Sequence, residues 1–277
     1  MEKNSLIAPF LKWVGGKRQL IPAINQLLPR QYNCYYEAFV GGGAVLFNIQ
    51  PGKAVINDFN PELINVYKVI KNHPEALIKD LKRHKNESDY FYELRALDRQ
   101  ASFAKLSDIK KASRIIYLNK TCYNGLYRVN SAGEFNAPFG RYKNPNIVND
   151  VTIRAVSEFL NANDITILNG DFEKAVESAQ QDDFVYFDPP YVPVSQSANF
   201  TGYVKGGFDL AEQERLRNVC HQLNDKGVKF LLSNSSTPVI HELYKDYDIQ
   251  IVKATRAINS NALKRGAIDE VLIRNYE

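Results

Sequence analysis

One short segment of the chain, Asp188-Pro189-Pro190-Tyr191, combines residue types that together form a hydrogen-bond acceptor site. The two prolines carry no backbone N–H and stiffen the chain, so the segment presents the Asp188 carboxylate and a fixed set of carbonyl oxygens. Such a site favours a donor such as an amino group, and the Tyr191 ring offers a flat face for stacking. The alternative is a turn in which Asp188 only caps the backbone. The doubled proline and the tyrosine after an apolar run favour the binding site.

The segment follows an apolar run, residues 184–187, which we predict to be a buried strand, and ligands of α/β sheets bind at the carboxyl ends of such strands. Other apolar runs alternate with helical patterns, which indicates a mostly parallel sheet with helices on both faces. The predicted strands are residues 35–38, 54–56, 166–168, 184–187, 229–233, 249–254 and 270–274. The predicted helices between them are residues 61–71, 172–180, 210–226 and 237–244, with Asp209 as an N-cap and Gly227 as a C-terminal stop.

The alternation of strands and helices fails over residues 72–161, where we predict an inserted, mainly helical domain. Its predicted helices are residues 74–84, 90–97 and 108–120, and a polar stretch follows them up to Asn149. Between Lys110 and Pro145 the chain has seven Lys or Arg residues and one acid, interleaved with aromatic residues. This composition suits phosphate neutralisation together with base contacts, although a solvated face over a local aromatic core is an equal alternative.

A glycine turn follows the first predicted strand, in Glu37-Ala38-Phe39-Val40-Gly41-Gly42-Gly43. Glycines there let the backbone approach a ligand, and the next helix presents its N-terminus to polar groups. The dinucleotide-binding pattern fails at Leu46, where it requires glycine. Asp58 ends the next strand, where a carboxylate often binds ribose hydroxyls, although Asp58 or Asn60 would also cap the following helix. Together these features favour an adenosine-containing ligand, either a dinucleotide or S-adenosylmethionine.

Two further segments have residue types suited to ligand binding. In Asn169-Gly170-Asp171-Phe172 the aspartate can accept from an amine and the phenylalanine can cover a ring, or the aspartate simply caps the next helix. The segment Lys12-Trp13-Val14-Gly15-Gly16-Lys17 is only superficially like a phosphate loop, because Leu11 and Arg18 stand where that motif needs glycine and Ser or Thr. NTP hydrolysis is therefore disfavoured, and the sole tryptophan is unusual there as plain core.

Global properties narrow the class of protein. With 277 residues, 44% of them hydrophobic and 24% charged, the chain is typical of a globular protein with one large or two modest domains. No apolar run reaches the roughly 18 residues of a membrane helix, and the N-terminus lacks a signal-peptide pattern. The three cysteines and four histidines show no metal-ligand spacing, so we expect a reduced, cytoplasmic protein without metal. The net charge of +4 favours a polyanionic partner only weakly.

Taken together, these segments resemble the Dam-type N6-adenine DNA methyltransferases, with the motif order of the alpha group. The resemblance covers nearly the whole chain, and its motifs are residues 12–17, 39–43, 57–58, 119–128, 133–142 and 188–191. The Asp-Pro-Pro-Tyr motif alone would also admit enzymes that act on RNA or on small substrates. Residues 119–142 are what narrow the substrate to DNA.

The resemblance also implies roles for individual residues. The catalytic residues would be Asp188, Pro189, Pro190 and Tyr191. The residues around S-adenosylmethionine would be Trp13, Lys17, Ala38, Phe39, Gly41, Gly43, Asp58, Asp171, Phe172 and Asp188. The residues that contact DNA bases and backbone would be Lys12, Tyr123, Asn124, Leu126, Arg128, Pro138 and Tyr142. No metal ligand is implied.

The fold that the resemblance implies is a Rossmann-like, seven-stranded, mostly parallel methyltransferase sheet. Residues 1–71 and 162–277 would form the catalytic domain, and residues 72–161 the target-recognition domain. The implied reaction is methyl transfer from S-adenosylmethionine to adenine N6 in duplex DNA, within GATC, by base flipping and direct in-line transfer. The implied setting is host protection in a restriction–modification system. We expect a monomer without an obligate protein partner, and residues 192–208 as a candidate lid.

Two other functions stay open at this point. The first is methylation of RNA adenine or of a side-chain amide, and the second is a non-catalytic DNA-binding regulator on the same scaffold. The intact acceptor motif and glycine turn argue against the regulator. A cytosine-C5 methyltransferase would need an activated cysteine near a proline, and none of Cys34, Cys122 and Cys220 is so placed. A nicotinamide dehydrogenase is disfavoured by the broken dinucleotide pattern.

Overall fold

The structure is a computed structural model of the full chain, and it describes residues 3–13, 15–192, 208–255 and 267–277. In that part of the chain a seven-stranded sheet has the strand order β3-β2-β1-β4-β5-β7-β6. Strands β1 to β5 run parallel to one another, whereas β7 is antiparallel to both β5 and β6. The strands are β1 (Tyr35–Glu37), β2 (Lys53–Asp58), β3 (Asp164–Asn169), β4 (Phe184–Phe187), β5 (Lys229–Ser235), β6 (Asp248–Thr255) and β7 (Ala267–Arg274). The predicted, mostly parallel α/β sheet is confirmed.

The central strands β1, β4 and β5 are buried on both faces, which explains why β4 and residues 230–232 of β5 are continuous apolar runs rather than alternating ones. In β4, Phe184 and Tyr186 point into one core, and Val185 and Phe187 point into the other. The first core is covered by α1 (Ile21–Leu27), α2 (Ala44–Ile49) and α3 (Pro61–Asn72). The second is covered by α8 (Phe172–Val176), α9 (Leu210–Asp225) and α10 (Pro238–Leu243).

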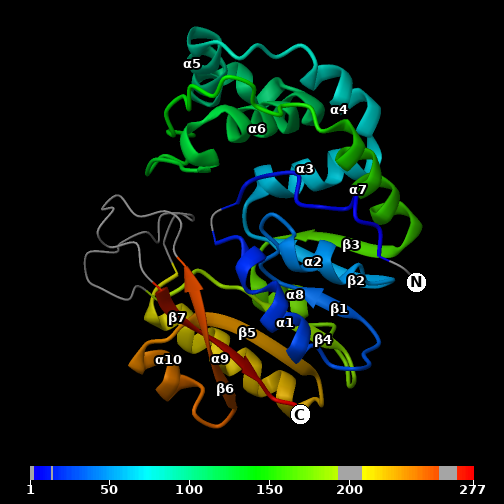
Figure 1. Ribbon diagram of the computed structural model, residues 1–277, viewed down its shortest axis with the longest axis vertical. Coiled ribbons are helices and arrows are strands. Elements are labelled where there is room, and N and C mark those ends of the chain that lie inside the picture. The colour runs from blue at the N-terminus through cyan, green and yellow to red at the C-terminus, as the bar shows by residue number, and fades with distance from the viewer. Residues whose placement is uncertain (1–2, 14, 193–207, 256–266) are drawn as a thin grey trace.

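A mainly helical region lies above α3, on the side away from α9 and α10 (Figure 1). It contains α4 (Pro74–Leu81), α5 (Ser88–Ala96) and α6 (Asp108–Thr121), and α7 (Asp150–Ala162) leads back to β3. Short 3₁₀ helices are η1 (Lys17–Gln19), η2 (Leu97–Arg99), η3 (Ala101–Lys105) and η4 (Tyr123–Gly125). The sequence did not indicate α7 as a separate helix, although its buried Ile153, Val156 and Leu160 recur at helical spacing. Helix α3 packs against both α6 and the sheet, so it joins the two parts.

The helix ends settle two alternatives that the sequence left open. Asn60, rather than Asp58, caps α3 by accepting from the amides of Glu62 and Leu63. Asp171 does cap α8, which ends at Val176 and is shorter than the predicted helix of residues 172–180. Asp209 caps α9 as expected. Gly227 follows that helix with φ at +72°, a left-handed conformation that stops it.

Candidate active site

The predicted catalytic and cofactor residues gather at one edge of the sheet. Strands β1 and β4 are neighbours, but the helix after β1 covers one face and the helix after β4 covers the other. This reversal leaves a crevice at the carboxyl ends of the two strands, the usual ligand site of open α/β sheets. Glu37 ends β1, Asp188 follows β4, and Asp58 ends β2 at the same edge.

The Asp188 carboxylate is already engaged by a cation from the N-terminal segment. The Lys17 ammonium lies 2.7 Å from Oδ1 of Asp188, and the Ser233 hydroxyl donates to the same oxygen at 3.1 Å. Lys17 also donates to the Gly15 carbonyl at 2.7 Å and lies 4.5 Å from the centre of the Tyr191 ring. Burial raises the pKa of Asp188, and the charge of Lys17 opposes that rise. The expectation that only acceptors face this spot is therefore wrong, because the sequence could not show that Lys17 folds onto them.

The segment from Asp188 to Tyr191 is held by side chains from three elements that follow it in the chain. Gln213 of α9 donates to the Pro190 carbonyl at 2.9 Å, so that carbonyl is also occupied. Ser233 of β5 contacts Asp188, and the Tyr191 hydroxyl donates to Glu270 of β7 at 3.0 Å. Pro189 is buried. These contacts fix the stiff acceptor segment against the sheet edge.

The glycine turn is fastened to Asp58. The Gly41 amide donates to Oδ2 of Asp58 at 3.0 Å, and the Asn60 amide donates to Oδ1 at 2.9 Å. Asn57 ties the turn to the neighbouring strand by donating to the carbonyls of Ala38 and Gly170. Burial raises the pKa of Asp58 to about 6, against the effect of its two amide donors. Each carboxylate oxygen keeps a lone pair for a further donor.

Glycine is required in this turn by its conformation and its neighbours. Gly43 has φ at +74°, and a Cβ there would lie 2.6 Å from the Phe47 ring and from the Tyr67 hydroxyl. A Cβ on Gly41 would lie 2.9 Å from the Trp13 ring. Trp13 is half-buried and stacks on Tyr127, with ring centres 4.8 Å apart. The tryptophan thus contacts the glycine turn on one side and the helical region on the other.

A second group lies at the start of α8. The Phe39 and Phe172 rings stack with centres 5.3 Å apart. Asp171 accepts from Arg215 of α9 at 2.7 Å, and this guanidinium lies 4.2 Å from the centre of the Phe172 ring. Hydrogen bonding to Arg215 lowers the pKa of Asp171. Arg215 was missed from the sequence, because an arginine on an amphipathic helix normally indicates only a solvated face.

Four of the predicted DNA-contacting residues lie in contact, in two pairs. The Lys12 ammonium lies 5.2 Å from the centre of the Tyr142 ring, and the Tyr123 amide donates to the Pro138 carbonyl at 2.8 Å. Arg128 is exposed, and its guanidinium donates to the side chain of Asn136 at 2.7 Å. Tyr123 and Asn124 are also exposed, whereas Leu126 is half-buried. Asn124 has φ at +58°, which Asn tolerates better than most residues.

Glu37 is a site residue that sequence reasoning did not single out, although a glutamate at the end of a buried strand is a recognisable signal. Its carboxyl group is buried and accepts from the Tyr35 hydroxyl at 2.7 Å. Burial raises its pKa to about 8, and the nearby carboxylates of Asp188 and Asp58 add to this rise. At neutral pH the folded protein therefore favours the protonated form of Glu37.

This protonation makes the stability of the ligand-free protein depend on pH. A carboxyl whose pKa is raised from 4.5 to about 8 on folding stabilises the protein at low pH, and this contribution is lost as the pH rises towards 8. We expect the free energy of unfolding to fall by up to about 1.4 kcal/mol per pH unit between pH 5 and 8. Denaturant titrations at pH 5, 6.5 and 8 measure this. Glu37→Gln should flatten the dependence, and parallel curves for the two proteins would contradict the assignment.

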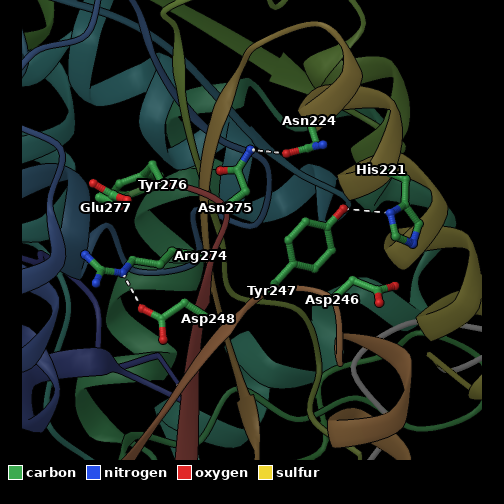
Figure 2. A pocket seen from close by; sticks show the side chains of 9 residues that line it. All are labelled: His221, Asn224, Asp246, Tyr247, Asp248, Arg274, Asn275, Tyr276 and Glu277. Carbon is green, nitrogen blue, oxygen red and sulfur yellow. Dashed lines mark hydrogen bonds and ion pairs between the residues drawn. The ribbon is translucent and has the colours of Figure 1, made fainter.

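A hollow of about 440 Å³ lies elsewhere. It is formed by the end of α9, the start of β6 and the end of β7, and its side chains pair with one another, as in the Arg274–Asp248 ion pair (Figure 2). Arg274 is opposite Leu231 near the start of β5, so the hollow lies at the amino ends of the parallel strands. It is not part of the candidate site.

The described residues lack the features of two other kinds of site. No group of His, Cys, Asp and Glu side chains there could hold a metal ion, and no helix there is long and apolar enough to cross a membrane. The cysteines are buried, and burial raises the pKa of the Cys122 thiol to about 12, which is the opposite of what a nucleophilic cysteine requires.

Comparison with known proteins decides what class of enzyme this geometry serves. Residues 13–258 match the family described as D12 class N6 adenine-specific DNA methyltransferase. The chain belongs to this family. It is 50% identical to the type II methyltransferase M1.LlaDCHI of Lactococcus lactis subsp. cremoris, across 100% of this chain and 98% of that protein. It is 40% identical to the type II methyltransferase M.MjaIII of Methanocaldococcus jannaschii, across 98% and 99% of the two chains. With the DNA adenine methylase of Haemophilus influenzae the identity is 37%, across 95% and 92%.

The adenine-specific methyltransferase family explains the chemistry of the crevice. Its substrate atom is an exocyclic amine, the kind of donor that Asp188 and the neighbouring carbonyls would bind. The family match also removes the open alternatives of a side-chain amide methyltransferase and a dehydrogenase. The crevice between β1 and β4 is therefore the candidate active site of a DNA adenine-N6 methyltransferase.

Proposed function

We propose that this enzyme transfers a methyl group from S-adenosylmethionine to N6 of adenine in duplex DNA, within GATC. The observation that carries the proposal is the shared sheet edge of two features. One is the acceptor segment with Asp188 and Tyr191, and the other is the glycine turn fastened to Asp58. The first suits an aromatic amine, and the second suits an adenosine-containing ligand.

The residues of the crevice fit a cationic methyl donor. Asp188 and Asp58 raise the pKa of Glu37, Asp188 also raises the pKa of Asp58, and Lys17 is the cation paired with Asp188 in the described part of the site. A positively charged ligand would offset this repulsion between carboxyl groups and is therefore favoured. S-adenosylmethionine, when bound, supplies an electrophilic methyl group on a positively charged sulfur. Asp58 would accept from its ribose, and the aromatic cluster at Phe39 would hold its adenine beside Asp171.

The chain's own residues would then activate the target amine. The N6 lone pair of adenine is delocalised into the ring, which makes the amine a weak nucleophile. The two N–H groups donate to Asp188 and to the Pro189 carbonyl, which favours tetrahedral nitrogen and localises the lone pair. The nitrogen would attack the methyl carbon in line, and the donor's sulfur would leave with the electron pair of the broken carbon–sulfur bond. Fixed acceptors stabilise the positive charge that develops on nitrogen, and one N–H proton then leaves to water.

The contacts of Asp188 favour one of its two oxygens for this role. Lys17 and Ser233 both contact Oδ1, which leaves Oδ2 for the amine among the contacts of the described residues. Adenine must leave the base stack to reach this crevice, and it would stack on Tyr191 after flipping. The candidate lid, residues 192–208, falls almost wholly outside the described residues.

Sequence recognition would belong to the helical region. We propose residues 72–161 as the target-recognition domain, and residues 1–71 and 162–277 as the catalytic domain. Lys12, Tyr142 and Arg128 supply the charge and the aromatic faces for phosphate and base contacts. The specificity for GATC rests on the resemblance of residues 119–142 to Dam-type enzymes, and in particular to the duplex-DNA methylase of the DpnII restriction–modification system. Two relatives are type II methyltransferases, which supports a role in restriction–modification.

Methyl transfer from labelled S-adenosylmethionine tests this proposal. The substrates are duplexes with GATC intact, duplexes altered at one base pair, and RNA of the same sequence. Label in the intact duplex alone, recovered as N6-methyladenine after nucleoside analysis, is the expected result. Label in RNA, or in the altered duplexes equally, would overturn the substrate or the specificity. Binding without transfer on any substrate would point to a DNA-binding regulator instead.

Removing the charge of Asp58 tests its proposed contact with the ribose. Asp58→Asn keeps the shape of the side chain but replaces a charged acceptor, so we expect the dissociation constant of S-adenosylmethionine to rise by about 10-fold or more. Isothermal titration calorimetry measures this constant. Asp164 begins β3 and therefore lies at the other edge of the sheet from Asp58. Asp164→Asn is a control that should leave the dissociation constant unchanged. Equal affinities for wild type and Asp58→Asn would rule out the contact.

A further inference from the structure

The Tyr191 ring is held at its hydroxyl group by a residue from the far end of the chain. Its hydroxyl donates to Oε2 of Glu270 at 3.0 Å. Glu270 lies on β7, opposite Ser235 at the last position of β5. Since β7 is antiparallel to β5, this part of β7 reaches the carboxyl edge of the sheet, where Asp188 lies. Glu270 is thus the residue through which the antiparallel strand β7 contacts the candidate site.

The other anchors of this segment act on its backbone or on Asp188. Gln213 donates to the Pro190 carbonyl at 2.9 Å, and the Val192 amide donates to Asn234 at 3.3 Å. The Ser235 hydroxyl donates to the Val192 carbonyl at 2.7 Å. These contacts set the path of the chain but leave the tyrosine side-chain torsions free. The bond to Glu270 acts on the ring itself, at a hydroxyl group that the Ser233 side chain also approaches.

The chemistry of this bond suits a positioning role. A hydroxyl that donates to a carboxylate forms a bond roughly twice as strong as one between neutral groups, so the ring stays fixed. One face of the ring is contacted by the Lys17 ammonium, 4.5 Å from its centre. Fixing the hydroxyl oxygen therefore sets the long axis of the ring. Because a phenolic O–H prefers to lie in the ring plane, the bond also favours one tilt of the ring relative to Lys17 and Asp188, the two groups that would meet the flipped base.

We propose that Glu270 is a positioning residue for methyl transfer: it orients the Tyr191 ring as the surface on which the target adenine stacks. This inference rests on the proposed function, because it assumes that the target base stacks on Tyr191. Glu270 itself does not touch the reacting atoms. A displacement of about 1 Å in such a surface can lower the rate constant by up to about 100-fold.

A double-mutant cycle with a conservative variant tests the proposal. Glu270→Ala and Tyr191→Phe should each lower kcat by about 10-fold or more, with a much smaller change in KM for DNA. The double variant should be no slower than the slower single variant, because both substitutions break the same bond. Glu270→Gln keeps an acceptor oxygen and should recover most of the rate. Asp269→Ala, the next carboxylate on β7, points to the opposite face of the sheet and serves as a control at the wild-type rate.

Several outcomes would overturn the role of Glu270. The first is an unchanged kcat in Glu270→Ala, and the second is additive losses in the double variant. The third is a loss of kcat in Glu270→Gln equal to that in Glu270→Ala, accompanied by a lowered unfolding midpoint. A duplex with 2-aminopurine at the target position gives an independent readout, because its fluorescence reports whether the flipped base is stacked. If wild-type enzyme methylates no duplex adenine, the proposed function fails instead, and that result is separate from the comparison of variants.

Discussion

Replacing Asp188 by asparagine is expected to lower the methyl-transfer rate constant by about 10²–10³-fold while DNA binding persists. The carboxylate would carry its effect in the transition state, where positive charge develops on the attacking nitrogen, and a neutral amide stabilises that charge less. Binding of the duplex is proposed to depend on the helical region, which does not contain Asp188. Single-turnover methylation measures the rate constant, and fluorescence anisotropy measures the affinity for the duplex.

The ion pair with Lys17 adds a structural consequence to this substitution. The two side chains are only 7% and 19% exposed, so loss of the carboxylate leaves a buried ammonium without its partner. Removing one partner of a buried pair costs about 3–5 kcal/mol, and Asn reduces this by keeping an acceptor oxygen. Asp188→Asn combined with Lys17→Met should recover part of the lost stability without recovering activity. Near-normal turnover in Asp188→Asn would refute the mechanism.

The second large effect is expected at Arg128, the proposed base-reading residue. Arg128→Ala should reduce discrimination at one base pair by about 1–3 kcal/mol, which is roughly 5–150-fold in relative kcat/KM. The structure supports a positioned guanidinium, because it donates to both the side chain and the carbonyl of Asn136. A bridge between Val129 and Phe135 closes the short hairpin that carries these residues.

A matched control separates base reading from phosphate contact. Lys143 is exposed in the same basic segment, and Lys143→Ala should weaken binding to all duplexes alike and lower the salt dependence by about one phosphate contact. The measurement is kcat/KM on a duplex with GATC and on duplexes changed at each base pair in turn. A uniform loss across all of these duplexes in Arg128→Ala would assign Arg128 to the phosphate backbone.

The sheet was predictable from the sequence because its buried strands consist largely of apolar residues. Residues 184–187 are all apolar or aromatic and all buried, and the motif after them was placed correctly at the carboxyl edge. The helix ends at Asp209 and Gly227 were predictable for a similar reason, since caps depend on local backbone chemistry. Strands and helix ends depend on local patterns, so they could be predicted from the sequence alone.

The pairings within the site were not predictable, because they join segments that are distant along the chain. Lys17 carries no sequence signal that points to Asp188, and Arg215 looks like any charge on an amphipathic helix until α9 packs beside Asp171. The same holds for Glu270 and Tyr191, which meet only because β7 runs antiparallel to β5. A charged residue could pair with many residues of opposite charge along the sequence, and only the tertiary fold determines which of them it contacts.

The position of Trp13 links two binding events that the protein is proposed to perform. Its side chain limits the space around Gly41 and Gly42, and Tyr127 of the helical region stacks on its ring. A ligand that shifts Trp13 from the glycine turn would therefore change the free energy of the surface that is proposed to contact DNA. Thermodynamic reciprocity then requires DNA to change the affinity for that ligand by the same factor. The coupling free energy is the same whether the methyl donor or the duplex binds first.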